Sequence, residues 1–208
     1  MTPRTLAIHA LLDRPVSLTG RAMLLVALVA LLGGAVLPLW RISLVAPQYA
    51  EGLSLDMYAY QIVAGNDGQD LAEINTLNHY IGMRPIAQAD FLEMKVLPFA
   101  IGAFSLLTLR AVVVGRIISL VDLAVLFLYF GAFSLGSFVY RLYSYGHHLD
   151  PQAPMKIKPF MPVVIGSQPI ANFVQTSVPL AGTLCMAAFL VLLVAALWSS
   201  VREARKAV

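Results

Sequence analysis

Histidine and methionine side chains gather in two stretches of the chain that lie between apolar segments. His79 is followed four residues later by Met83, so both would share one face of a helix that continued to residue 83. Imidazole and thioether are soft ligands that suit copper, particularly Cu(I). His147, His148 and Met57 are further candidate metal ligands, although adjacent histidines do not share a helix face. For any single one of them, a solvated histidine or a space-filling methionine is the simpler interpretation.

The grouping of these residues strengthens the metal interpretation. Five of the eight methionines and three of the four histidines fall in, or at the edge of, the same two stretches; the methionines are Met57, Met83, Met94, Met155 and Met161. No M-x-M or H-x-H motif is present, so the pattern predicts an open copper site more than a tight one. The single cysteine, Cys185, excludes an internal disulfide framework and a thiolate zinc cluster.

The composition is that of a helical membrane protein. The 208 residues are 59% hydrophobic and only 12% charged, with a mean hydropathy of +0.79. Charged residues alone make up about a quarter of a typical soluble domain. A soluble globular enzyme and a disordered chain are therefore excluded, and a lipid bilayer is the expected surrounding. The net charge of +3 is small, and we expect no nucleic-acid partner.

Four apolar runs are long enough to cross a bilayer, which requires roughly 20 helical residues. They cover residues 22–40, 96–115, 117–140 and 178–201. We therefore predict an all-α fold in which residues 1–208 form a single polytopic membrane domain with four transmembrane helices. The first run could instead be a signal peptide, but it is long for one and no clean cleavage site follows, which favours an uncleaved anchor.

Basic residues lie on one side of this arrangement. The three clusters are Arg4, Arg14 and Arg21; Arg110 and Arg116; and Arg202, Arg205 and Lys206. Because basic loops stay in the cytoplasm, both termini are predicted to be cytoplasmic. The loops 41–95 and 141–177 would then be extracytoplasmic and would fold together into a small cap. The expected location is the bacterial cytoplasmic (inner) membrane, which the chain would cross several times.

The first long loop carries signals for a turn and a helix. Asn66-Asp67-Gly68 is a strong turn signal. Residues 70–83 form an apolar stripe at helical spacing, which predicts an amphipathic helix that stops at Gly82; the stripe consists of Leu71, Ile74, Leu77 and Ile81. Asp70 and Glu73 fit an acidic variant of the capping box at its start.

The second long loop begins with tyrosines and ends without charge. Tyr140, Tyr143 and Tyr145 are typical of an aromatic belt at the membrane interface. Residues 159–173 combine prolines and polar residues in an apolar setting. Irregular backbone at membrane depth must be buried in protein or line a cavity, so this segment packs on the first loop or dips into the interface. Contact with a partner protein is an equally weighted alternative.

Asp122 is an acidic residue inside a predicted span, where an ionisable group is costly. Pairing with Arg110 or Arg116 near the cytoplasmic end would make it a structural ion pair, and we favour this over a proton path.

Three segments, APQYAEGL (46–53), EINTLNHYIGM (73–83) and KPFMPVVIGSQPIANF (158–173), resemble a family of small bacterial membrane proteins. The genes of that family lie beside those of extracytoplasmic copper enzymes, and the resemblance is to the NosB-like membrane proteins of nitrous oxide reductase gene clusters. The resemblance implies an accessory role in supplying or building a copper enzyme outside the membrane, and it implies no catalytic residues.

The leading hypothesis is therefore a non-enzymatic protein that handles copper for an extracytoplasmic copper enzyme or assists its maturation. A second hypothesis is a non-catalytic scaffold subunit with a membrane or periplasmic protein partner. A third is a quinone or haem site between spans and cap, with His79 as an axial ligand. Metal affinity, partner co-purification and a visible spectrum would distinguish the three.

Overall fold

The chain folds as two compact units. The computed structural model describes the backbone of residues 3–206 and the side chains of residues 8–206. One part, here the helical unit, consists of residues up to Ala35, Pro98–Ala132 and the residues from Leu184 onward. The other, the sheet unit, consists of Val36–Leu97 and Phe133–Thr183.

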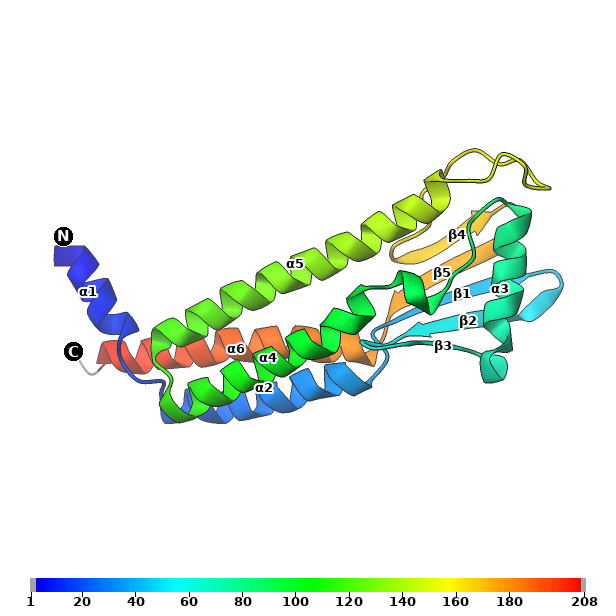
Figure 1. Ribbon diagram of the computed structural model, residues 1–208. Helices are drawn as coiled ribbons and strands as arrows, with labels where there is room; N and C mark the ends of the chain where they lie inside the picture. The colour runs from blue at the N-terminus through cyan, green and yellow to red at the C-terminus, as the bar shows by residue number, and fades with distance from the viewer. Residues whose placement is uncertain (1–2, 207–208) are drawn as a thin grey trace. The chain divides into compact units, whose positions relative to one another are not determined.

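Four of the described helices are long and apolar enough to cross a membrane (Figure 1). They are α2 (Leu18–Val36), α4 (Glu93–Val114), α5 (Ile117–His147) and α6 (Ala181–Lys206). Each overlaps a predicted span, which supports a multi-pass membrane protein. The predicted bounds are wrong at two ends, because Trp40 belongs to β1 and residues 178–179 belong to β5. The helix α5 continues past residue 140 to His147, and its last turns bury Leu142 and Tyr145, which are three residues apart and share one helix face. A shorter helix, α1 (Pro3–Leu12), precedes α2.

The helices of the helical unit approach one another through small residues and phenylalanines. Gly20 of α2 lies so close to Ser200 of α6 that an added Cβ would be 2.5 Å from the serine hydroxyl. Close helix contacts through small residues are typical of membrane proteins. The ring of Phe127 lies 5.2 Å from that of Phe104 and 4.6 Å from that of Phe189, measured between centroids. These contacts bury the interior of the unit, while its outer surface stays apolar.

The two segments predicted as loops form a five-stranded antiparallel sheet, so the prediction of an all-α fold is wrong for them. The strands are β1 (Trp40–Ala46), β2 (Tyr49–Met57), β3 (Ile62–Ala64), β4 (Gly166–Ile170) and β5 (Phe173–Pro179). Their order is β3-β2-β1-β5-β4, and β1 of the first segment pairs with β5 of the second. The segment 159–173 packs on the first loop through Ile170 and Phe173, which share the hydrophobic core with Leu55 and Ile74. Its strand β4 pairs with β5 in a hairpin, and the strand pairing with the first loop is made by residues 174–179 of β5.

Alternation of buried and exposed side chains explains why these residues form strands. In β1, Ile42 and Leu44 are buried whereas Arg41 and Val45 are exposed. A period of two places alternate side chains on opposite faces of a sheet. The period is visible in the sequence of β1, where Arg41 and Ser43 alternate with apolar residues. It is hidden in β5, where the polar Gln175 and Ser177 are buried and Val174 is exposed.

The helix α3 (Gln69–Tyr80) covers one face of the sheet, after the short 3-10 helix η1 (Asn66–Gly68); a second one, η2 (Gln88–Asp90), comes before α4. The predicted turn and apolar stripe are confirmed: Asp67 and Gly68 have positive φ, and Ile74, Leu77 and Ile81 are buried in the core of the sheet unit.

The predicted capping box at the start of α3 is wrong. The N-cap is Gly68, and no side chain caps the helix. The buried carboxylate of Asp70 instead accepts a hydrogen bond from the backbone N–H of Ser54 at 2.8 Å, which ties α3 to β2. Glu73 accepts a hydrogen bond from the hydroxyl of Tyr49 on β2.

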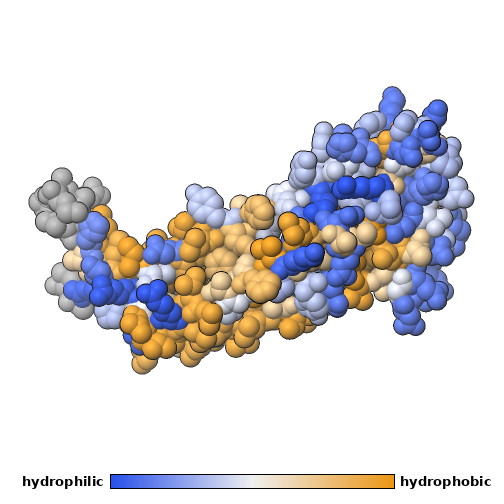
Figure 2. Space-filling view, viewed as in Figure 1, coloured by the Kyte–Doolittle hydropathy of each residue, from blue (hydrophilic) through white to orange (hydrophobic). Residues whose placement is uncertain are grey.

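The surfaces of the two units differ in character. Figure 2 shows hydrophobic side chains over most of the visible surface of the long helices, and hydrophilic side chains over most of the visible sheet unit. An apolar outer surface on long helices fits contact with lipid, whereas the sheet unit has a surface suited to water.

Candidate ligand cavity in the sheet unit

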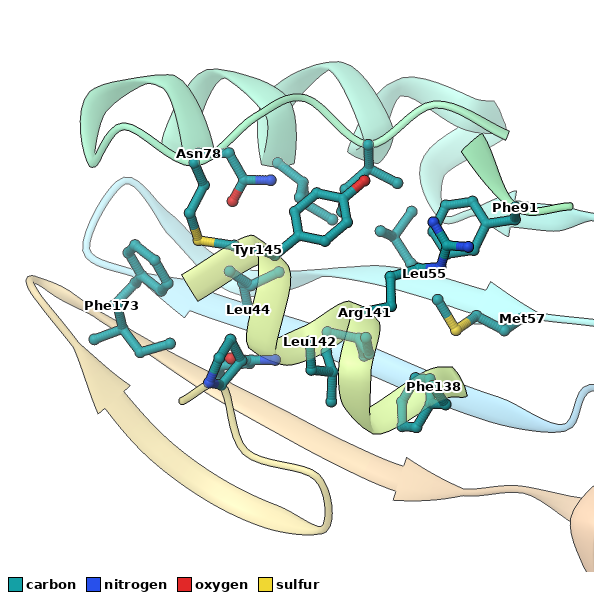
Figure 3. A pocket seen from close by; sticks show the side chains of 17 residues that line it. Leu44, Leu55, Met57, Asn78, Phe91, Phe138, Arg141, Leu142, Tyr145 and Phe173 are labelled. Atoms are coloured by element: carbon teal, nitrogen blue, oxygen red, sulfur yellow. The ribbon is translucent and has the colours of Figure 1, made fainter. Parts of the chain in front are cut away.

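A cavity of about 60 Å³ lies inside the sheet unit, between the covered face of the sheet, α3 and the last turns of α5 (Figure 3). Its walls are almost entirely apolar, and they include Leu44, Leu55, Ile74, Phe91, Phe138 and Phe173. A volume of this size corresponds to about two water molecules or one very small organic molecule, given that one water occupies ~30 Å³ in the liquid.

Two buried polar side chains line this cavity without a hydrogen-bond partner. Asn78 is 3% exposed and Tyr145 is 5% exposed. Within the described part of the chain, the Nδ2 atom of Asn78 and the hydroxyl of Tyr145 form no hydrogen bond of normal geometry, and the charged neighbour of Tyr145, Arg84, lies over its ring. Figure 3 shows both side chains reaching into the space between α3 and the strands. Leaving such a group unpaired costs about 1–3 kcal/mol, so each is a position where a bound oxygen would stabilise the protein.

The end of α3 determines which side chains enter the cavity. The carbonyl of Asn78 accepts hydrogen bonds from the N–H groups of Ile81 and Met83, at 3.2 and 2.8 Å. Gly82 has a φ of +79°, and a Cβ there would lie 2.9 Å from the carbonyl oxygen of Asp150. The chain therefore reverses at Gly82, and Met83 is directed to the cavity and not along the helix.

Residues 83–91, here the covering segment, close one side of the cavity and are held from two directions. The side chain of Asn75 on α3 brackets Ile86: its Nδ2 donates to the Ile86 carbonyl at 3.1 Å, and its Oδ1 accepts from the Ile86 N–H at 2.7 Å. The guanidinium of Arg84 lies over the ring of Tyr145, 4.5 Å from its centroid. Both kinds of contact fix the position of the segment against α3 and α5.

The electrostatics of the cavity favour a neutral ligand. Arg141 is the charged residue in the lining, and its Nη2 lies 2.7 Å from the carboxylate of Glu93. Ser137 donates a further hydrogen bond to that carboxylate, and Arg141 also lies 4.6 Å from the ring centroid of Phe91. Since the guanidinium is already paired, a charged ligand would lose its hydration without gaining a free counterion.

The structure separates the residues predicted to bind copper. Met57 and Met83 both line the cavity. His79 is exposed on α3, and because α3 ends at Tyr80 it does not share a helix face with Met83. His147 stacks on Tyr143 with ring centroids 3.8 Å apart, and His148 places its Nδ1 3.0 Å from the Ser144 carbonyl. Among the described residues, no three His, Cys, Asp or Glu side chains are grouped as metal ligands.

The predicted ion pair is replaced by another in the helical unit. Arg110, Arg116 and Asp122 line one groove between α4 and α5. The guanidinium of Arg116 lies 3.1 Å from Asp13, so its partner is Asp13 and not Asp122. Asp122 forms no ion pair with a side chain of the described residues 8–206.

Sequence reasoning missed the two residues that distinguish the cavity. Asn78 lies four residues after Ile74, so its position on the apolar stripe was a usable signal for a buried polar group. Tyr145 was assigned to an interfacial belt with Tyr140 and Tyr143, but it is buried whereas those two are exposed. No family model, curated protein or solved structure matches the chain.

Proposed function

We propose that this chain is a non-catalytic, multi-pass membrane protein whose sheet unit binds a small neutral molecule with an apolar body and a hydrogen-bonding oxygen. The observation that carries the proposal is the pairing of an apolar cavity with two buried polar groups that have no partner, Asn78 and Tyr145. Ligand sites are typically apolar with a few placed polar groups that orient the ligand.

The binding chemistry follows from the two side chains. The Asn78 amide can donate to a carbonyl, ether or hydroxyl oxygen, and the Tyr145 hydroxyl can donate or accept. The apolar walls would hold the carbon part of the ligand. Arg141 is held in place by its ion pair with Glu93. It would therefore form part of the cavity wall and would not serve as a counterion for the ligand.

The distribution of basic residues supports an orientation for the protein. With basic clusters at both ends of the chain and at the α4–α5 turn, the positive-inside rule favours cytoplasmic termini and an extracytoplasmic sheet unit. The protein would then present its cavity outside the cytoplasmic membrane of a bacterium, as an accessory protein to a partner there.

Acetone and isobutene form a matched pair of probes, because they share a shape and differ in a carbonyl against a methylene group. Binding would be measured by ligand-observed NMR with the full chain in nanodiscs. We expect saturable binding of acetone that Tyr145→Phe and Asn78→Leu each weaken by about 2- to 12-fold, the effect of one hydrogen bond. Isobutene should bind independently of the Tyr145 hydroxyl.

Tyr143→Phe is the matched control, since it removes a hydroxyl from the same helix at an exposed position. Equal effects of Tyr143→Phe and Tyr145→Phe, or no saturable binding of acetone, would refute the proposal. In the second case ordered water alone would fill the cavity.

Copper handling for an extracytoplasmic copper enzyme is a second candidate function, favoured by the two thioethers that share the cavity. Met57 and Met83 supply soft donors for Cu(I), in line with the resemblance to proteins of copper-enzyme gene clusters. A competition titration with a Cu(I) chelator tests it. Stoichiometric Cu(I) that Met57→Leu/Met83→Leu loses and Met155→Leu keeps would support copper handling. A protein that holds no copper but retains a partner on purification would instead favour a scaffold subunit.

A further inference from the structure

The last turns of α6 carry an aromatic and two cationic side chains in a row. Trp198, Arg202 and Lys206 are spaced four residues apart, so they lie along one face of the helix. At a rise of 1.5 Å per residue the row extends over ~12 Å. Trp198 is 73% exposed, so its indole is not part of the packed interior.

This row forms one side of a groove of about 670 Å³ within the helical unit. On the N-terminal side of Trp198, the groove is lined by Val191 and Val194 of α6. Met23 of α2 also borders it. The lining therefore changes along α6 from aliphatic to aromatic to cationic. A lipid has the same order of chemistry: acyl chains, then the glycerol region where tryptophan prefers to lie, then the phosphate.

The charges of the groove match a headgroup with one negative charge. Arg202 and Lys206 contribute two positive charges and Glu203 one negative, which leaves a net charge of +1. The Glu203 carboxylate accepts a hydrogen bond from the Ser199 hydroxyl at 3.3 Å, which draws it toward the preceding turn. The guanidinium and ammonium are thus the groups available to a phosphate, which arginine binds with two hydrogen bonds and lysine as a point charge.

We infer that this groove binds an anionic phospholipid of the phosphatidylglycerol type, with its phosphate on Arg202 and Lys206 and an acyl chain along Val191 and Val194. The inference is independent of the cavity in the sheet unit. Basic pockets on transmembrane helices are known binding sites for acidic lipids. The groove between α4 and α5 also holds two arginines and one acid, but its lining has no tryptophan and its Arg116 is paired with Asp13, so it is a natural control of equal net charge.

The test compares lipid retention by native mass spectrometry of the delipidated full chain. It uses phosphatidylglycerol and phosphatidylcholine with identical acyl chains, added in equal amounts. We expect at least ~10-fold preference for phosphatidylglycerol. Arg202→Gln/Lys206→Gln should lower its retention by about 25-fold, since each cationic group near an anionic headgroup contributes roughly a factor of five. Arg110→Gln/Arg116→Gln should change retention by less than twofold.

Three further measurements distinguish a lipid site from a folding defect and from a general anion site. The exchanged variant Arg202→Lys/Lys206→Arg keeps both charges and should retain the lipid, which shows that the charges and not the residue types are required. Unchanged retention of phosphatidylcholine by the glutamine variant shows that its loss of phosphatidylglycerol is not a folding defect. Inorganic phosphate in large excess should not displace the lipid. Equal retention of the two lipids, equal losses in both glutamine variants, or full displacement by phosphate would each overturn the inference.

Discussion

Replacing Asp70 with alanine should destabilise the sheet unit by about 2 kcal/mol. Asp70 is 5% exposed, and its carboxylate accepts the Ser54 N–H at 2.8 Å. A hydrogen bond to a charged group contributes ~1.5–3 kcal/mol, and a carboxylate in the first turn of a helix adds ~0.3–1 kcal/mol. Release of the desolvation cost of the buried carboxylate offsets part of this sum, which leaves about 2 kcal/mol. Asp70→Asn keeps an acceptor and should fall between alanine and wild type.

Tryptophan fluorescence can isolate this effect, because the chain has two tryptophans and they lie in different units. With Trp198→Phe as the background, Trp40 reports on the sheet unit alone. Its Nε1–H donates to Ser177 Oγ at 2.7 Å, and its ring lies 5.1 Å from that of Phe138. Denaturant unfolding in detergent would give the free energy of unfolding from the midpoint and slope.

Asp67→Asn is the control, since it removes one negative charge near the same end of α3 at an exposed position. Asp67 has a positive φ, which both aspartate and asparagine adopt readily, so the substitution adds no backbone strain. It should change the free energy of unfolding by less than ~0.5 kcal/mol. A loss below ~0.5 kcal/mol for Asp70→Ala, or equal losses for Asp70→Asn and Asp67→Asn, would refute the reasoning that the contact with β2 makes Asp70 important.

Three further predictions concern the same unit. Gly82→Ala should lower the free energy of unfolding by about 1–3 kcal/mol, because Gly82 has a positive φ and an added Cβ would press on the Asp150 backbone; the Trp40 assay measures this. The hydrogen bond from the Tyr49 hydroxyl to the Glu73 carboxylate raises the pKa of Tyr49 above its usual value of 10.0. The stabilisation by this hydrogen bond is therefore complete below the pKa of the unfolded state and is lost as the pH rises through the pKa of the folded state. Tyr49→Phe should flatten the alkaline part of a profile of stability against pH. In protein freed of ligand, Tyr145→Phe should raise the free energy of unfolding by up to ~1 kcal/mol, since it removes an unpaired buried hydroxyl, and a decrease in a thermal or chemical unfolding series would show that water already satisfies that group.

The four long helices and α3 were predictable because their signals are local. A span needs only a run of apolar residues, and the stripe of Ile74, Leu77 and Ile81 repeats at helical spacing within one segment. The turn before α3 was likewise evident from Asn66-Asp67-Gly68, whose backbone requirements do not depend on the rest of the chain.

The complete sheet was not predictable in the same way because one of its pairings, between β1 and β5, joins distant segments, whereas the other pairings join consecutive strands. The partners of Ile42 and Leu44 on β5 are Ser177 and Gln175, more than 130 residues later in the chain. In β5 the hydrophobic alternation is reversed, because the polar Gln175 and Ser177 are buried whereas Val174 is exposed. The apolar character of these segments was visible in the sequence, but the choice between loop and strand depends on contacts across the fold.

The cavity depends on tertiary structure for the same reason. Amino-acid types alone placed Met57, Met83 and the histidines among the candidate ligands, and the fold brings the two methionines to one cavity and leaves the histidines outside its lining. Asn78 and Tyr145 became candidates only once α3 and α5 had buried both side chains without a partner. The sequence by itself determined which segments are apolar and helical; burial, which gives a polar group its chemical significance, arises only when those segments pack together.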